Sequence, residues 1–169
     1  MAKFDMSDLG KMHYFLAIEA VQSAIKIFVS QRKYVQEILN RFQIKNCNSV
    51  STPVKIGLKL IKEPEGKRVD STLYKQIMGS LIYLTTIRPD IMHAISLISR
   101  YMKSPSETHL LTAKRIFRYL QETIEYGLFY KNGGKSDLFD FTNSDYVGDS
   151  DDRKSTSAYV FMMDSAAIS

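Results

Sequence analysis

The sequence predicts an α+β protein with a β-hairpin at the N-terminus, a mainly helical middle and a β-unit at the C-terminus. Three observations lead to this prediction. Apolar residues alternate with a period of two near both ends of the chain, and they recur at helical spacing in the middle. Clusters of Pro, Gly, Asn and Ser separate these stretches. We expect four segments: a hairpin with its helix (1–45), a loop (46–69), the helical region (70–134) and the C-terminal β-unit (135–169).

The N-terminal segment is expected to contain a short helix, a hairpin and a longer helix. Residues 4–10 predict the short helix, which ends at Gly10 because glycine suits the position after a C-cap. Residues 12–19 and 25–30 alternate like strands and predict the hairpin. Ser30 is expected to cap the next helix. The buried face of that helix has helical spacing: Tyr34, Val35, Ile38, Leu39 and Phe42.

The middle of the chain predicts three helices. Asp70 is the expected N-cap of the first, which runs to about residue 84, and Pro89 suits the first position of the second. Ser104 and Glu107 have the spacing of a capping box, so the third helix is expected to start there and to end before Gly127. Residues 126–130, 137–142 and 157–163 are then expected to be strands.

Composition excludes several classes of protein. No run of about 18 apolar residues is present, as a membrane span would require, and the N-terminus lacks the apolar core of a secretory signal. We therefore expect an intracellular protein without a membrane partner. The single cysteine, Cys47, has no second cysteine for an internal disulfide. The three histidines are widely spaced, so no metal site is expected.

The net charge of +5 is unevenly distributed along the chain. Residues 1–134 carry 20 Lys and Arg against 11 Asp and Glu, whereas residues 135–169 carry 3 against 7. This division indicates two physical units, and the basic one is able to attract polyanions.

Several strings in this order resemble one family. Residues 4–10 (FDMSDLG) and 13–19 (HYFLAIE) resemble the end of the reverse transcriptase palm in Pol polyproteins of copia-type retrotransposons. Residues 51–53 (STP), 79–85 (GSLIYLT) and 88–91 (RPDI) resemble the thumb-like region that follows. Residues 152–157 (DRKSTS) with 159–161 (YVF) resemble the start of the ribonuclease H domain. The resemblance implies a piece of such a polyprotein, with a truncated ribonuclease H-like β-unit at its C-terminus.

The resemblance also implies chemistry that this chain lacks. Polymerases and ribonucleases H of the family use carboxylates that hold two magnesium ions. The polymerase carboxylates lie partly on a Tyr-x-Asp-Asp turn, which this sequence does not contain. Asn143 stands at the position expected for the first ribonuclease H aspartate, and Asp145 is a remaining acid. We therefore expect no catalytic residues, no bound metal or other cofactor, and no enzymatic activity. Ala17 stands where the family often has glycine.

Weak, non-specific binding of an RNA or DNA duplex is the activity that the sequence still predicts. The candidate residues are basic side chains on the second and third helices of the middle: Arg100, Lys103, Lys114, Arg115 and Arg118. Such side chains contact phosphates without reading sequence. The alternatives are a solvated basic surface, and a domesticated module that uses the helical middle to bind another protein.

Overall fold

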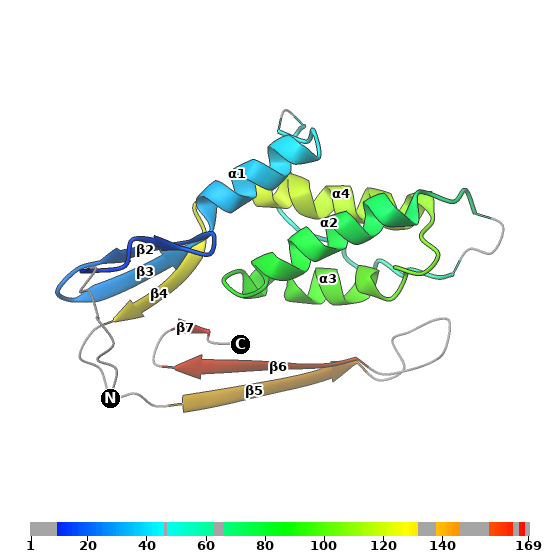
Figure 1. The fold of residues 1–169 in the computed structure, drawn as a ribbon. Helices are drawn as coiled ribbons and strands as arrows, with labels where there is room; N and C mark the ends of the chain where they lie inside the picture. The colour runs from blue at the N-terminus through cyan, green and yellow to red at the C-terminus, as the bar shows by residue number, and fades with distance from the viewer. Residues whose placement is uncertain are drawn as a thin grey trace, which may run out of the picture.

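The computed structural model describes residues 10–45, 47–62, 66–131, 138–145, 156–163 and 166–167. Helices and strands are segregated: a group of helices packs beside one antiparallel sheet, and a second antiparallel sheet lies along the group (Figure 1). Most of the helix predicted at residues 4–10 lies outside the described residues.

The first sheet has four strands in the order β1-β2-β3-β4, and each neighbouring pair is antiparallel. The strands are β1 (Tyr14–Phe15), β2 (Ile18–Gln22), β3 (Lys26–Ser30) and β4 (Gly127–Lys131). The predicted hairpin is confirmed by the pairing of β2 with β3. The prediction of a single strand over 12–19 was wrong, because the chain reverses between Phe15 and Ile18.

That reversal depends on an unusual backbone conformation. Leu16 and Ala17 have φ angles of 46° and 61°, in the left-handed region that costs an L-residue about 1–2 kcal/mol. The Tyr83 hydroxyl donates a hydrogen bond to the Leu16 carbonyl and so ties the turn to a helix. A glycine at position 17 would adopt this φ without steric cost.

The helices are α1 (Arg32–Arg41), α2 (Ser71–Leu84), the 3₁₀ turn η1 (Pro89–Ile91), α3 (Met92–Ser99) and α4 (Glu107–Glu122). They share one apolar core, whose fully buried members include Ile38, Leu81, Ile98 and Phe117. The helix predicted from Pro89 to about Lys103 is shorter than expected, because it starts as a 3₁₀ turn and α3 ends at Ser99. The predicted cap Asp70 is confirmed, since its side chain accepts a hydrogen bond from the Thr72 amide at 2.8 Å.

Helix α1 begins one residue later than predicted and has a cap from another element. Its N-cap is Gln31 rather than Ser30, and no side chain of the cap itself bonds the first turn. The Glu19 carboxylate, on strand β2, instead accepts a hydrogen bond from the Lys33 amide at 3.1 Å. A carboxylate at this end also opposes the positive end of the helix dipole. Tertiary structure therefore supplies what local sequence was expected to provide.

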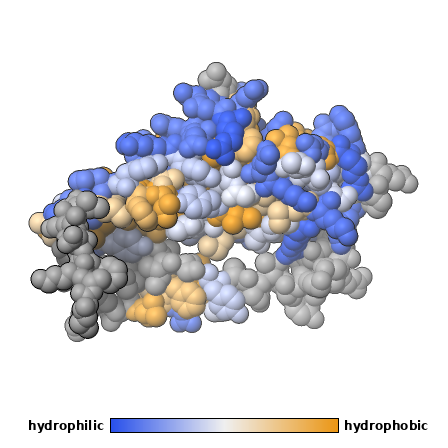
Figure 2. All heavy atoms as spheres, viewed as in Figure 1, coloured by the Kyte–Doolittle hydropathy of each residue, from blue (hydrophilic) through white to orange (hydrophobic). Residues whose placement is uncertain are grey.

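The second sheet consists of β5 (Leu138–Asp145), β6 (Thr156–Met163) and β7 (Ala166–Ala167), in that order and all antiparallel. Several of its apolar side chains are open to solvent, and Phe139 and Phe141 of β5 are 49% and 57% exposed. Figure 2 shows hydrophobic residues at the surface of this sheet. The ribonuclease H-like character of the unit stays a prediction.

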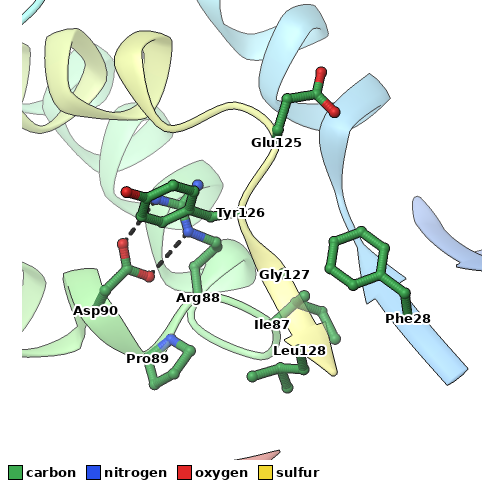
Figure 3. Close-up of a pocket in the computed structure, with 9 residues that line it drawn as sticks. All are labelled: Phe28, Ile87, Arg88, Pro89, Asp90, Glu125, Tyr126, Gly127 and Leu128. Atoms are coloured by element: carbon green, nitrogen blue, oxygen red, sulfur yellow. Dashed lines mark hydrogen bonds and ion pairs between the residues drawn. The ribbon is translucent and has the colours of Figure 1, made fainter. Parts of the chain in front are cut away.

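An ion pair between the buried Arg88 and Asp90 lies at the start of η1 (Figure 3), and Arg88 also connects this turn to the end of α4. The Arg88 side chain is only 2% exposed, and it donates to both Asp90 carboxylate oxygens at 2.9 and 2.7 Å. It also donates to the Thr123 carbonyl at 3.0 Å and to the Thr123 hydroxyl. The rings of Tyr119 and Tyr126 lie 5.8 and 5.4 Å from its guanidinium carbon. All of this positive charge is thus paired or screened inside the protein.

The ion pair changes the titration of its neighbours. Burial by itself would raise the pKa of Asp90, but hydrogen bonds and charge from Arg88 and a hydrogen bond from Tyr119 hold that pKa below its ordinary value. Burial and the Asp90 carboxylate raise the pKa of Tyr119.

Strand β4 starts at Gly127, where a Cβ atom would lie 2.2 Å from the Val29 carbonyl oxygen. Glycine is required there by the close approach of β3.

We expect Ala17→Gly to raise the free energy of unfolding by about 1 kcal/mol, because it removes the strain of a left-handed alanine. The matched control is Ala20→Gly in the same hairpin. Ala20 is buried in an ordinary strand, so its replacement is expected to lower stability by about 1 kcal/mol. Urea unfolding measures both. Equal effects of the two substitutions would contradict a special conformation at position 17.

We expect Asp90→Asn to lower the free energy of unfolding by about 3 kcal/mol at neutral pH, because it leaves the Arg88 charge buried without its counter-ion. The folded-state pKa of Asp90 is depressed. Its contribution is therefore present above the unfolded pKa of about 4 and disappears as pH falls through the folded pKa. When the pH falls from 7 to below the folded-state pKa of Asp90, the free energy of unfolding should therefore decrease less in the variant than in the parent.

The control is Glu37→Gln, which removes one partner of the exposed Arg41–Glu37 pair. An exposed pair contributes less than about 1 kcal/mol, so this variant should unfold almost like the parent. Urea unfolding at several pH values compares the free energies of unfolding of the two variants and the parent. The structural role assigned to Asp90 is refuted if its variant matches the control at every pH.

Candidate nucleic-acid interface

Helix α4 carries three of the five predicted binding residues, and its N-terminus is fixed by a capping box. The box differs from the predicted pair of Ser104 and Glu107: the N-cap is Ser106, and its partner is His109. The Ser106 amide donates to Nδ1 of His109 at 3.0 Å. Since Nδ1 accepts this hydrogen bond, Nε2 carries the ring proton and donates it to the Ile61 carbonyl at 3.1 Å.

This histidine also connects the helix to the preceding loop. The His109 ring is buried and stacks on Tyr101, with 3.8 Å between ring centroids. The Tyr101 hydroxyl donates to the Leu60 carbonyl at 2.9 Å. Residues 60 and 61 are therefore held against the start of α4 by two side chains. Sequence analysis considered the three histidines only as possible metal ligands, and the spacing of three residues between Ser106 and His109 was the signal for this role.

Two of the predicted binding residues hold the other half of the same loop. Arg115 donates from Nη2 to the Thr52 hydroxyl at 2.9 Å, and Arg118 donates from Nε to the Asn48 carbonyl. Both side chains are partly buried, whereas Lys114, one residue before Arg115, is exposed. The three residues therefore do not form one open face, because the loop covers part of it.

Arg100 and Lys103 lie in the connection between α3 and α4 and are exposed. Figure 2 shows that hydrophilic residues cover the upper face and one end of the helical part of the molecule. The structure brings Arg115 and Arg118 together in one pocket, but Arg100, Lys103 and Lys114 do not line it. These three are surface cations of the helical unit, which consists of α1, α2, η1, α3, α4 and the connections between them.

The pocket has a volume of about 320 Å³ and lies between α4 and the loop that precedes α2. Besides the two arginines it contains Lys55, a residue that sequence analysis did not single out. No local pattern could identify Lys55, because its loop has no periodicity. Its position follows only from the contacts that Arg115 and Arg118 make with the loop.

Asn143 and Asp145, the residues considered for ribonuclease H chemistry, both lie on strand β5. Their backbones pair with Ala158 and Thr156 of β6. Among the described residues, no group of three or more His, Cys, Asp or Glu is arranged to hold a metal ion. Within the same part of the chain, no helix is both long and apolar enough to cross a membrane.

Comparison with known proteins relates the chain to transposons. Residues 1–56 match the family model described as reverse transcriptase (RNA-dependent DNA polymerase). The chain is 38% identical over 167 residues to the retrovirus-related Pol polyprotein from transposon RE1 of Arabidopsis thaliana. It is 37% identical over 175 residues to the corresponding polyprotein from transposon TNT 1-94 of Nicotiana tabacum. An uncharacterized mitochondrial protein of Arabidopsis thaliana is 35% identical over 156 residues.

The extent of these matches is uneven. The alignments cover 99% of this chain with RE1, 98% with TNT 1-94 and 92% with the mitochondrial protein. The chain spans only 11% and 13% of the two polyproteins, but 65% of the mitochondrial protein. No solved structure matches. Residues 1–56 of the chain match the reverse transcriptase model. The chain belongs to the family of Pol polyproteins of copia-type retrotransposons and corresponds to a segment of such a polyprotein.

Proposed function

We propose that this segment binds the backbone of RNA or DNA non-specifically through its helical unit and catalyses no reaction itself. The observation that carries the proposal is the set of cations on and beside α4, at the exposed positions Arg100, Lys103 and Lys114. Contacts of this kind neutralise phosphates and release counterions, so the affinity depends on salt and not on base sequence. The relatives are Pol polyproteins by name, which favours this proposal over a protein-binding module.

The charge distribution supports the same proposal. Residues 1–134 have an excess of Lys and Arg, and the acidic excess is confined to residues 135–169. Several cations of the helical unit are already neutralised, as in the Lys67–Glu107 pair at 3.6 Å and the buried Arg88–Asp90 pair. Lys114 forms no ion pair within the described part of the chain. It therefore remains available to a polyanion.

The proposal that this chain catalyses no reaction rests on the metal-binding groups that its sequence provides. Two-metal catalysis needs several carboxylates that bridge and clamp the ions. Where the resemblance places the first catalytic aspartate, the sequence has the neutral amide of Asn143, and Asp145 follows two residues later. This donor set does not fit a pair of magnesium ions, because each lost carboxylate removes a formal negative charge from the site. The chain is therefore not expected to position two magnesium ions for catalysis.

We expect simultaneous Arg100→Glu, Lys103→Glu and Lys114→Glu substitutions to weaken duplex binding equally for all sequences. The slope of log affinity against log salt should fall by roughly 2–3, since each lost phosphate contact contributes about 0.9. Fluorescence anisotropy with two unrelated duplexes at several salt concentrations measures both effects.

The matched control reverses Lys11, Lys26 and Lys131, three exposed lysines on or near strands of the first sheet, and so changes the net charge equally. It should reduce the salt slope much less. If both triple variants change the slope alike, the binding reports net charge and the helical unit is not the interface. An affinity that is independent of salt in the parent would overturn the proposed function itself.

We expect no DNA synthesis by this chain on a poly(A)–oligo(dT) primer–template with magnesium or manganese, because the paired carboxylates that position two metals are missing. Incorporation of labelled dTTP measures the activity, and a heat-inactivated sample gives the background. Incorporation above that background would show that another donor set supports catalysis.

A further inference from the structure

The pocket between α4 and the preceding loop has an unusual balance of charge. Three cations line it, Lys55, Arg115 and Arg118, together with the hydroxyl-bearing side chains Thr108 and Thr112. No Asp or Glu is among its lining residues. Within the described part of the chain, none of the three cations forms a salt bridge, in contrast to Arg32, Arg41 and Lys67. An anion entering this pocket would meet positive charge without a competing carboxylate.

The arginines are held in place before any ligand arrives. Thr52 and the Asn48 carbonyl each accept a hydrogen bond from one guanidinium and so restrict its rotation. The Nε atom of Arg115 is buried and has no hydrogen-bond partner. A buried N–H group without an acceptor is destabilising, so an acceptor that reaches this atom would be favoured. The site is thus rigid and has donor capacity left.

We propose that this pocket is a binding site for one phosphate group. Phosphate oxygens accept hydrogen bonds from guanidinium donors in the geometry that arginine presents, and they form strong charge-assisted bonds with Lys as well. Leu58 and Leu111 add an apolar wall, against which an attached sugar would pack. That the phosphate belongs to a polynucleotide rests on the proposed function; a free phosphate ion is the other source with the same chemistry.

The first test uses inorganic phosphate and the whole chain. Millimolar phosphate, compared with chloride at equal ionic strength, should shift the backbone amide resonances of residues 55, 108, 112 and 115 with a saturating dependence. Lys55→Glu should weaken this binding by about tenfold, because it replaces an attractive charge by a repulsive one. Lys55 is exposed, so this substitution leaves the fold intact. Lys75→Glu on α2, an equal charge change outside the pocket, should leave phosphate binding unchanged.

The second test identifies the source of the phosphate. Single-stranded oligonucleotides with a 5′-phosphate or a 5′-hydroxyl are compared for binding to the parent and to Lys55→Glu. Preference for the 5′-phosphate, lost in the variant, assigns a terminal phosphate. Equal binding of both, with a salt slope lower by about 0.7 in the variant, assigns an internal phosphodiester.

The outcomes separate this inference from the proposed function. If neither oligonucleotide binds while inorganic phosphate still saturates the pocket, the proposed function fails and the ligand is the free ion. If oligonucleotides bind but phosphate shifts no pocket amide, or shifts them equally in Lys55→Glu, the pocket is not a phosphate site and the inference is overturned.

Discussion

The burial of Arg88 is the constraint on which the rest of the helical unit depends. A guanidinium cannot be deprotonated in a protein, so burying it requires partners for its donors. Asp90 supplies two acceptors within the same turn, and Thr123 supplies two more from the end of α4. These bonds fix the C-terminus of α4 against the α2–α3 connection. Because β4 starts shortly after Thr123, they also determine where the chain enters the first sheet.

The same helix serves the core and the polar surface, and its periodicity keeps the two separate. Phe117 and Leu120 are buried in the apolar core, whereas Lys114 lies on the solvent side. Arg115 and Arg118 lie at the boundary, where each is partly buried and donates a hydrogen bond to the loop. A basic helix face is therefore not a uniform binding surface. Only the cations that the loop leaves exposed, or that it encloses in a pocket, are available to a ligand.

Local sequence patterns predicted helices and strands better than their caps and partners. Capping by Asp70 and the β2–β3 hairpin involve neighbours along the chain, so propensity and periodicity were sufficient. The cap of α1 comes from Glu19 on another strand, and β4 pairs with β3 across the whole helical region. Neither contact leaves a local pattern. Lys55 was missed for the same reason, since its place in the pocket depends on loop contacts made from α4.

The structure gives a physical reason why the family resemblance by itself does not decide whether this chain is catalytic. The strings that carry the resemblance include Glu19, Arg88 and Asp90, and each has a structural role: a helix cap or half of a buried ion pair. Ala17, where the family often has glycine, lies in a left-handed turn that also concerns folding and not chemistry. Residues of this kind stabilise the fold whether or not metal-binding carboxylates are present. A close match to the family over these positions therefore indicates a shared fold and ancestry, and activity has to be judged from the donor groups alone.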